Sequence, residues 1–84
     1  MIHGGVQGVG FRYFVLNAAV RLGLRGWVRN NDDGTVELVA EGSRAALERL
    51  RQAAETGPRI ARVDRVDAFF TAAAGGFSGF NLTD

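Results

Sequence analysis

The sequence predicts an α+β protein whose elements follow the order strand, helix, strand, strand, helix, strand, with one further strand near the C-terminal end. Two stretches carry apolar residues at the spacing of an amphipathic helix, and a third alternates apolar and polar residues as a half-buried strand does. The 84 residues are 46% hydrophobic, which is ordinary for a small domain with one core. We therefore expect an antiparallel sheet of four to five strands with two helices on one face.

The N-terminal part is predicted to form a short strand, a glycine-rich turn and the first helix. Residues 1–3 are predicted to be the end of this strand. Only about four residues precede the glycine turn, whereas a typical strand has about five or six. Gly23 is suited to end the helix at residues 11–22, because glycine readily adopts the left-handed conformation there. The apolar face of this helix comprises Phe11, Val15, Ala18, Ala19 and Leu22.

Residues 24–30 and 35–41 are predicted to pair as a hairpin. The dipeptide Asp33-Gly34 between them favours a tight turn, because a hairpin turn needs residues that tolerate positive φ. The second strand alternates as a half-buried antiparallel strand does. Its two faces are Val36, Leu38 and Ala40 on one side, and Thr35, Glu37 and Glu41 on the other.

The remaining residues are predicted to form a second helix and two strands. Ser43 is suited to cap a helix that runs to about residue 55 and stops at Gly57-Pro58. A strand at 62–70, a flexible connection at 71–76 and a closing edge strand at 77–82 follow. This order is the split βαβ plan of a ferredoxin-like sandwich, and residues 1–84 are expected to form a single domain. The second helix's apolar stripe is Leu47, Leu50 and Ala54, and its expected ion pairs are Arg44–Glu48 and Arg51–Glu55.

The composition excludes several classes of function. The chain has no cysteine, hence no thiolate nucleophile and no Cys-based metal site. All ten basic residues are arginine, which excludes a Schiff-base lysine and a Walker-type phosphate loop. The net charge of +1 and the interleaved charges argue against a nucleic-acid partner. No apolar run is long enough for a membrane span and no signal peptide is visible, so we expect a cytoplasmic protein without a membrane partner.

The segment at residues 5–12 indicates a phosphate-binding loop. Its glycines let backbone N–H groups approach a ligand, and the start of the following helix is a favourable site for an anion. Its last residue is an arginine, whose planar guanidinium can bind phosphate through two hydrogen bonds. The segment reads Gly5-Val6-Gln7-Gly8-Val9-Gly10-Phe11-Arg12.

Residues 6–12 resemble the signature of the acylphosphatase family letter for letter. A second block, at 26–30 and 33–37, is also similar to that family. The chain as a whole resembles the free-standing, single-domain members of the family. The resemblance implies a hydrolase that cleaves the carboxyl–phosphate bond of small acyl phosphates without metal, cofactor or covalent intermediate. It implies that Arg12 clamps the phosphate and that Asn30 holds the attacking water. The backbone amides implied to cradle the phosphoryl oxygens are those of Val6, Gln7, Gly8, Val9, Gly10 and Phe11.

The residue types fit that reaction chemically. The leaving carboxylate has a conjugate acid of pKa about 4 and needs no protonation, so no general acid is required. The single histidine, His3, precedes the glycine turn. Asn30 can orient water through its carbonyl but cannot act as a base. Asn31 is equally suited to a turn, and strand alternation places only Asn30 on the face of Val28.

Other residues admit alternative interpretations. Asp32 and Asp33 could bind a metal, although adjacent aspartates before a glycine are more often turn formers. Asp64 and Asp67 could form an acid/base pair, although their alternation with Arg62 and Arg65 favours a solvated strand face. The aromatic residues Trp27, Phe69 and Phe70 are interpreted as core or edge packing.

Two other functions are weighed against the enzyme. A catalytically weak module that binds phosphate or carbamoyl phosphate is the alternative, as in the acylphosphatase-like domain of hydrogenase-maturation carbamoyltransferases. Those domains usually have proline where this chain has Tyr13, and relatives often carry a bulkier, basic residue in place of Gly5. An RNA-recognition domain would need aromatic residues on strand 35–41, which has none. A monomer is expected, with a strand-exchanged dimer as the alternative because the first strand is short.

Overall fold

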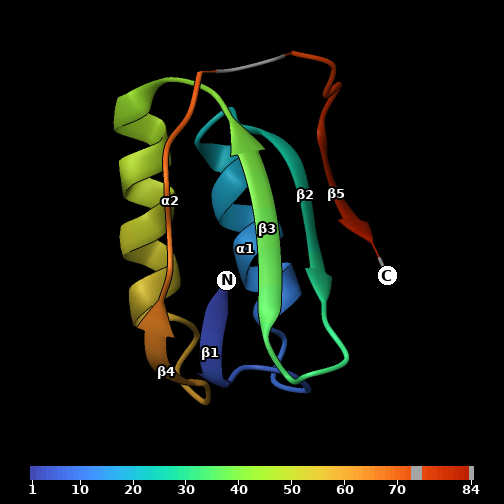
Figure 1. Ribbon diagram of the computed structural model, residues 1–84, viewed down its shortest axis with the longest axis vertical. Helices are drawn as coiled ribbons and strands as arrows, with labels where there is room; N and C mark the ends of the chain where they lie inside the picture. Colours follow the sequence, from blue (N-terminus) through green and yellow to red (C-terminus); the bar gives the residue numbers. More distant parts are fainter. Residues whose placement is uncertain (73–74, 84) are drawn as a thin grey trace.

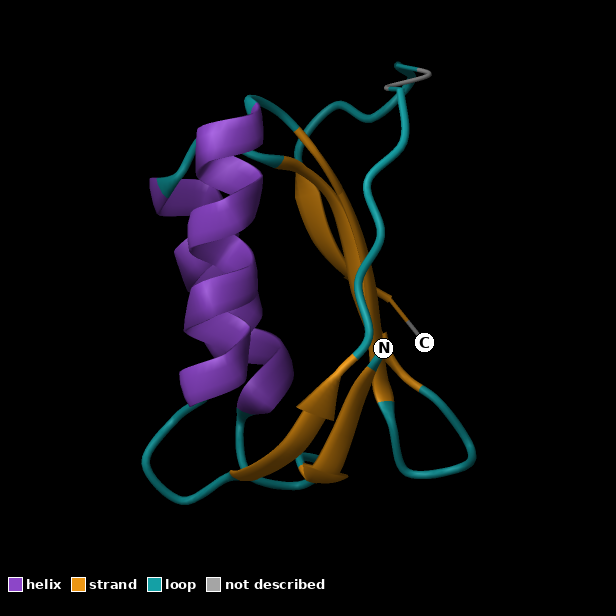
Figure 2. Ribbon diagram, turned by 60° about the vertical axis from the view of Figure 1, so that its left-hand side comes forward, coloured by secondary structure: helices purple, strands orange, loops and turns teal. Residues whose placement is uncertain are grey.

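Two helices cover one face of a five-stranded sheet in the computed structural model, which describes residues 1–72 and 75–83 (Figures 1 and 2). The strand order is β4-β1-β3-β2-β5. The predicted ferredoxin-like sandwich is thereby confirmed. The elements are β1 (Ile2–Gly5), α1 (Phe11–Arg21), β2 (Arg25–Asn30), β3 (Val36–Glu41), α2 (Arg44–Thr56), β4 (Arg62–Val66) and β5 (Phe80–Thr83).

The sheet is antiparallel except at one edge, where the expectation of a fully antiparallel sheet is wrong. β5 pairs parallel to β2, in a register that runs from Gly26 opposite Phe80 to Arg29 opposite Thr83. The chain leaves β4 upward in Figure 1, reaches the far end of the sheet and then returns, so β5 descends beside β2. The long connection between the last two strands therefore determines the direction of this edge strand.

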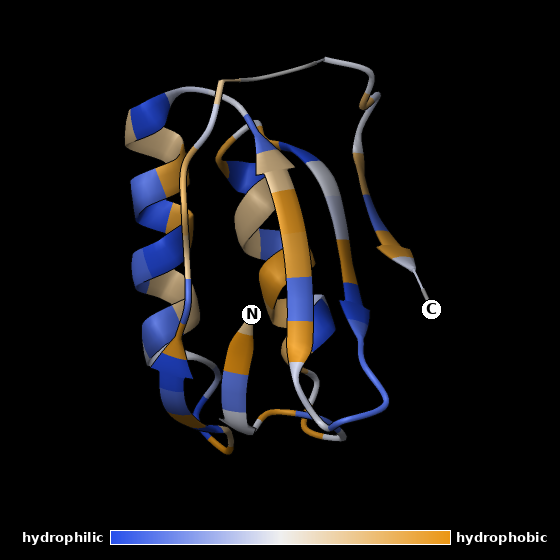
Figure 3. Cartoon of the chain, in the orientation of Figure 1, coloured by the Kyte–Doolittle hydropathy of each residue, from blue (hydrophilic) through white to orange (hydrophobic). Residues whose placement is uncertain are grey.

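The core lies between the helices and the sheet, where the helical periodicity predicts it. Phe11, Val15, Ala18 and Ala19 of α1 are buried, and Leu22 at the end of the helix is partly buried. From α2, Leu50 and Ala54 are buried and Leu47 packs against the core. In Figure 3 the outer side of α2 is mainly hydrophilic, as expected for an amphipathic helix.

The predicted helix ends are confirmed. Gly23 has φ 72°, and the N–H groups of Gly23 and Leu24 donate to carbonyls of the last turn of α1 at 3.1 and 2.9 Å. At the start of α2, the hydroxyl of Ser43 accepts a hydrogen bond from the N–H of Ala46 at 3.1 Å. The predicted ion pairs on α2 are also present, Arg44–Glu48 at 3.5 Å and Arg51–Glu55 at 2.9 Å.

β3 departs from its predicted half-buried pattern at Glu41. We expect this residue on the polar face, but it is only 8% exposed. Its carboxylate accepts a hydrogen bond from the N–H of Gly75 at 2.8 Å and lies 3.8 Å from the guanidinium of Arg25. The connection that follows β4 thus covers the end of β3, a long-range effect that strand periodicity does not report.

β4 is shorter than predicted. It ends at Val66 instead of residue 70, and the last backbone bond along this edge runs from the N–H of Asp67 to the carbonyl of Met1 at 2.9 Å. Phe69 is 89% exposed, so its interpretation as packing is wrong. The ring of Phe70 lies 3.9 Å from the guanidinium of Arg44 and covers a charge on α2.

The first and last strands are as short as the sequence suggests. β1 has four residues, and it joins β3 through a single pair, Ile2 opposite Val36, but pairs with β4 along its whole length. β5 begins at residue 80, later than the predicted 77. The predicted flexible connection at 71–76 includes residues 73 and 74, which lie outside the described residues. Neither α1 nor α2 is both long and apolar enough to cross a membrane.

Candidate active site

The glycine-rich loop at residues 6–10 links β1 to α1 and has two residues in the left-handed conformation. Gly8 and Gly10 have φ values of 75° and 76°, whereas Val9 between them has an ordinary negative φ. Left-handed residues that alternate with residues of negative φ are typical of the backbone segments that bind anions through successive N–H groups. A Cβ atom at either glycine would meet nothing within 4 Å, so the positive φ, and not lack of space, requires glycine here.

The start of α1 adds further N–H donors. The first helical hydrogen bond runs from the N–H of Phe14 to the carbonyl of Gly10 at 3.0 Å, so the three preceding N–H groups have no helical acceptor. Gly10 has no side chain to cap them, and the first turn, all of which is described, carries no acidic residue. The positive end of this helix is therefore available to an anion next to the loop.

Arg12 and Asn30 lie at the same end of the sheet, next to the end of β5. Arg12 belongs to the first turn of α1, and its guanidinium lies 3.5 Å from the carbonyl oxygen of Thr83. Thr83 is in register with Arg29, the residue before Asn30. This contact is at the outer limit of a hydrogen bond, and it is the only hydrogen bond that the Arg12 side chain makes to a residue that the structure describes.

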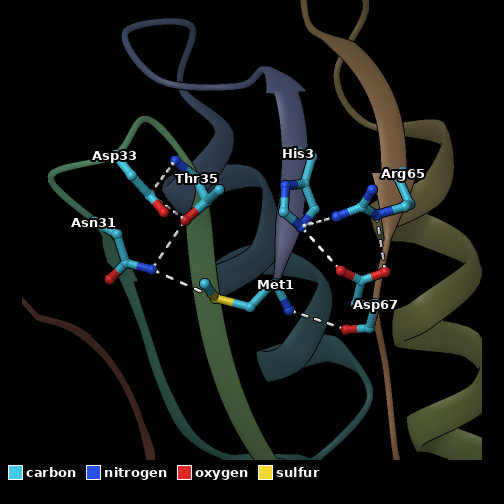
Figure 4. A network of polar contacts seen from close by, with 7 residues as sticks. All are labelled: Met1, His3, Asn31, Asp33, Thr35, Arg65 and Asp67. Carbon is cyan, nitrogen blue, oxygen red and sulfur yellow. Dashed lines mark hydrogen bonds and ion pairs between the residues drawn. The ribbon is translucent and has the colours of Figure 1, made fainter.

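The hydrogen bonds distinguish the two neighbouring asparagines. The amide of Asn31 donates to the hydroxyl of Thr35 at 3.0 Å and to the sulfur of Met1 at 3.4 Å (Figure 4). Its side-chain oxygen accepts a hydrogen bond from Arg29 at 3.1 Å. The side chain of Asn30 makes no hydrogen bond to another described residue. Asn31 therefore orders the turn, whereas Asn30 is available to a ligand.

A small polar hollow lies at this end of β2. It has a volume of about 280 Å³ and is lined by Arg29, Asn30, Asn31 and Asp32. The carboxylate of Asp33 closes the adjacent turn, accepting hydrogen bonds from the N–H of Thr35 at 3.0 Å and from its hydroxyl at 2.7 Å. These two bonds, the hydroxyl first, lower the pKa of Asp33 below its ordinary value.

Asp33 therefore has the role of a turn former. Among the residues that the structure describes, no group of three or more His, Asp or Glu side chains is arranged to hold a metal ion.

Gln7 has a role that the sequence reasoning missed. Its side-chain Nε2 donates to the carbonyl oxygens of Asn31 at 2.7 Å and of Thr35 at 2.9 Å, which joins the glycine-rich loop to the β2–β3 turn. The sequence did contain a signal, because Gln7 is the one polar side chain among the glycines and valines of residues 6–10.

His3 lies on the opposite face of the sheet from the helices. Ile2 next to it points into the core, and neighbouring residues of a strand point to opposite faces. The His3 Nε2 atom lies 3.0 Å from the carboxylate of Asp67 and 3.1 Å from the guanidinium of Arg65 (Figure 4). The hydrogen bond from Arg65, followed by that from His3, lowers the pKa of Asp67. The cluster of His3, Arg65 and Asp67 is separate from the glycine-rich loop at residues 6–10.

The neighbouring Asp64 does not form an acid/base pair with Asp67. It lies 3.0 Å from the guanidinium of Arg62, and each of the two aspartates therefore has its own arginine partner. Arg62 also lies beside Gly5, since a Cβ there would be in ordinary van der Waals contact with the Arg62 side chain at 3.6 Å. The solvated, charged strand face that the sequence indicates is the arrangement observed.

Known proteins resemble the chain over nearly all of its length. The family model described as Acylphosphatase matches residues 1–82. An acylphosphatase of Salinibacter ruber is 53% identical over 81 residues, which cover 96% of this chain and 85% of that protein. The crystal structure of acylphosphatase from Bacillus subtilis has a TM-score of 0.95 and 38% identity, and the match covers 99% of this chain and 92% of that one.

A longer protein also contains this fold. Full-length HypF, in its phosphate- and nucleotide-bound form, matches with a TM-score of 0.87 and 31% identity. The match covers 99% of this chain but only 11% of HypF, whereas the acylphosphatases match over most of both chains. By its family model, its sequence relatives and its fold, the chain belongs to the acylphosphatase family of enzymes.

Proposed function

We propose that this enzyme hydrolyses acyl phosphates by in-line attack of a water that Asn30 orients on a phosphoryl group held by Arg12 and the backbone N–H groups of residues 6–12. The observation that carries the proposal is the glycine-rich loop with its left-handed residues, together with the adjoining helix start, whose N–H groups beside Arg12 have no backbone acceptor among the described residues. Donors fixed in this way stabilise charge that develops on phosphoryl oxygens without reorganising during the reaction.

The proposed step balances without a general acid or base from the protein. The water oxygen forms a bond to phosphorus while the bond from phosphorus to the acyl oxygen breaks. The carboxylate leaves with that electron pair, and it needs no proton because its conjugate acid has a pKa of about 4. The proton of the water passes to a phosphoryl oxygen of the substrate. Asn30 accepts a hydrogen bond from the water through its carbonyl oxygen and so aims a lone pair at phosphorus.

The first test is hydrolysis of benzoyl phosphate, followed by absorbance, with and without excess EDTA. We expect equal rates, because the proposed step uses only protein donors and water. A rate that EDTA abolishes and a divalent cation restores would contradict the metal-free mechanism. A folded wild-type protein without turnover would instead support the alternative of a phosphate-binding module, which the relatives do not favour.

The rate is expected to be flat between about pH 6 and 8. Asn30 does not titrate and arginine stays protonated throughout this range, whereas an unperturbed histidine would titrate near pH 6.5. The measurement is kcat against pH for the wild type and for His3→Gln, which should give superimposable profiles. A step near pH 6.5 that disappears in His3→Gln would assign a catalytic role to His3 and overturn this mechanism.

The substrate, the oligomeric state and the location of the enzyme are considered apart from its reaction. The small-molecule acyl phosphate partner follows from the proposed reaction, and the phosphoryl head group alone does not select among acyl phosphates. The single domain, the monomeric state and the cytoplasmic location stay predictions from the sequence.

A further inference from the structure

The side chain of Gln7 connects the two parts of the site that the reaction must align. Its Nε2 group reaches from the glycine-rich loop to both ends of the β2–β3 turn, 24 and 28 positions further along the chain. The distances to the carbonyl oxygens, 2.7 Å for Asn31 and 2.9 Å for Thr35, are those of well-formed hydrogen bonds. A primary amide has two N–H donors, so this arrangement uses the full donor capacity of Gln7.

The two acceptors are the carbonyls that close the turn itself. The carbonyl of Asn31 also accepts from the N–H of Gly34 at 3.2 Å, and the carbonyl of Thr35 accepts from the N–H of Asn31 at 2.9 Å. Gln7 therefore holds the turn at its closing hydrogen bonds, where the turn has little freedom to deform. Any displacement of these bonds moves Asn30, because Asn30 directly precedes Asn31.

We propose that Gln7 is a positioning residue, whose two side-chain hydrogen bonds set the separation and angle between the phosphoryl-binding N–H groups and the water held by Asn30. This inference rests on the proposed function and goes beyond it. The backbone of Gln7 lies in the loop that holds the phosphoryl group, and its side chain holds the turn next to Asn30. In-line attack is sensitive to such alignment, since a misplacement of about 1 Å can cost about 100-fold in rate.

The most informative substitution is Gln7→Met, which keeps the length of the side chain and removes both donors. We expect kcat for benzoyl phosphate to fall at least about tenfold because the water loses its alignment. KM and the inhibition constant of inorganic phosphate should stay within about threefold of wild type, because the loop keeps its glycines and its N–H groups. The matched control is Gln52→Met on the exposed side of α2, which should leave all three constants unchanged.

A double-mutant cycle distinguishes positioning from a general structural role. In the Asn30→Ala background, Gln7→Met should change kcat less than about twofold, because no held water remains to be misaligned. An equal loss of kcat in both backgrounds would overturn the proposal. So would a parallel loss of phosphate binding, or a wild-type kcat in the Gln7→Met single variant.

A replacement variant covers a folding failure of Gln7→Met, and the result for Asn30→Ala separates the two proposals. If circular dichroism shows that Gln7→Met does not fold, Gln7→Asn replaces it, since Asn keeps the amide but is one methylene too short to reach the turn. If Asn30→Ala retains the wild-type kcat, Asn30 does not orient the attacking water, and the proposed function is contradicted at that step. If Asn30→Ala is impaired while Gln7→Met is not, only the role of Gln7 fails.

Discussion

Replacement of Arg12 by alanine is expected to lower kcat/KM for benzoyl phosphate by about 10³-fold. The guanidinium is the one side-chain cation in the first turn of α1, directly beside the glycine-rich loop, and its only hydrogen bond to a described residue is the 3.5 Å contact with Thr83. It therefore has donors available for a phosphoryl group. The measurement is steady-state hydrolysis together with inhibition by inorganic phosphate, and phosphate inhibition should weaken in the variant as well.

Two companion variants make the Arg12 result specific. Arg49→Ala removes an exposed arginine from α2 and should leave kcat/KM unchanged. Arg12→Lys keeps the charge but loses the planar pair of donors, so we expect it to restore only a small part of the activity. An Arg12→Ala enzyme within threefold of the wild type would remove this residue from the proposed mechanism.

Replacement of Asn30 by alanine is expected to lower kcat by about 100-fold with little change in phosphate inhibition. In the proposed mechanism Asn30 holds the attacking water and does not hold the phosphoryl group, so its loss should affect the chemical step more than phosphate binding. Rapid measurement of benzoyl phosphate hydrolysis at saturating substrate gives kcat directly. Asn17→Ala on the exposed side of α1 is the matched control and should behave as wild type.

The comparison between the effect of Asn30→Ala on kcat and its effect on phosphate inhibition tests the role of Asn30 most directly. If Asn30→Ala weakens phosphate inhibition as strongly as Arg12→Ala does, Asn30 binds the phosphoryl group and another group must hold the water. Asn31→Ala offers a contrast within the same turn. Because the side chain of Asn31 bonds to Thr35 and Arg29, its removal should lower the stability of the protein.

Elements whose signals are local were predicted well from the sequence. The bounds of α1 follow from its apolar spacing and from Gly23. The start of α2 follows from Ser43, whose hydroxyl accepts a hydrogen bond from the N–H group three residues further along the chain. The glycine-rich loop belongs to the same class, because positive φ at Gly8 and Gly10 is a property of the residues themselves. These structures depend on contacts within a few residues, which a sequence pattern records directly.

Features that join distant segments were predicted poorly. The parallel direction of β5 depends on the path of the chain after β4, and the burial of Glu41 depends on Gly75, 34 positions away. Phe69 has an aromatic side chain suited to packing, yet it is 89% exposed because β4 has already ended. Residue type and periodicity carry no information on which segment covers another.

The sequence by itself determined the order of the elements, and it predicts a phosphate-binding loop at residues 6–12 with Arg12 as its cation. Only the tertiary structure decided how the loop is joined to the β2–β3 turn. The hydrogen bonds from Gln7 to Asn31 and Thr35 exist because folding brings the end of β1 next to that turn. Separate hydrogen bonds to Thr35 and Arg29 hold the side chain of Asn31, whereas the side chain of Asn30 makes no hydrogen bond to another described residue. Local conformational preference thus builds the loop, whereas long-range packing aligns it with the residue proposed to hold the water.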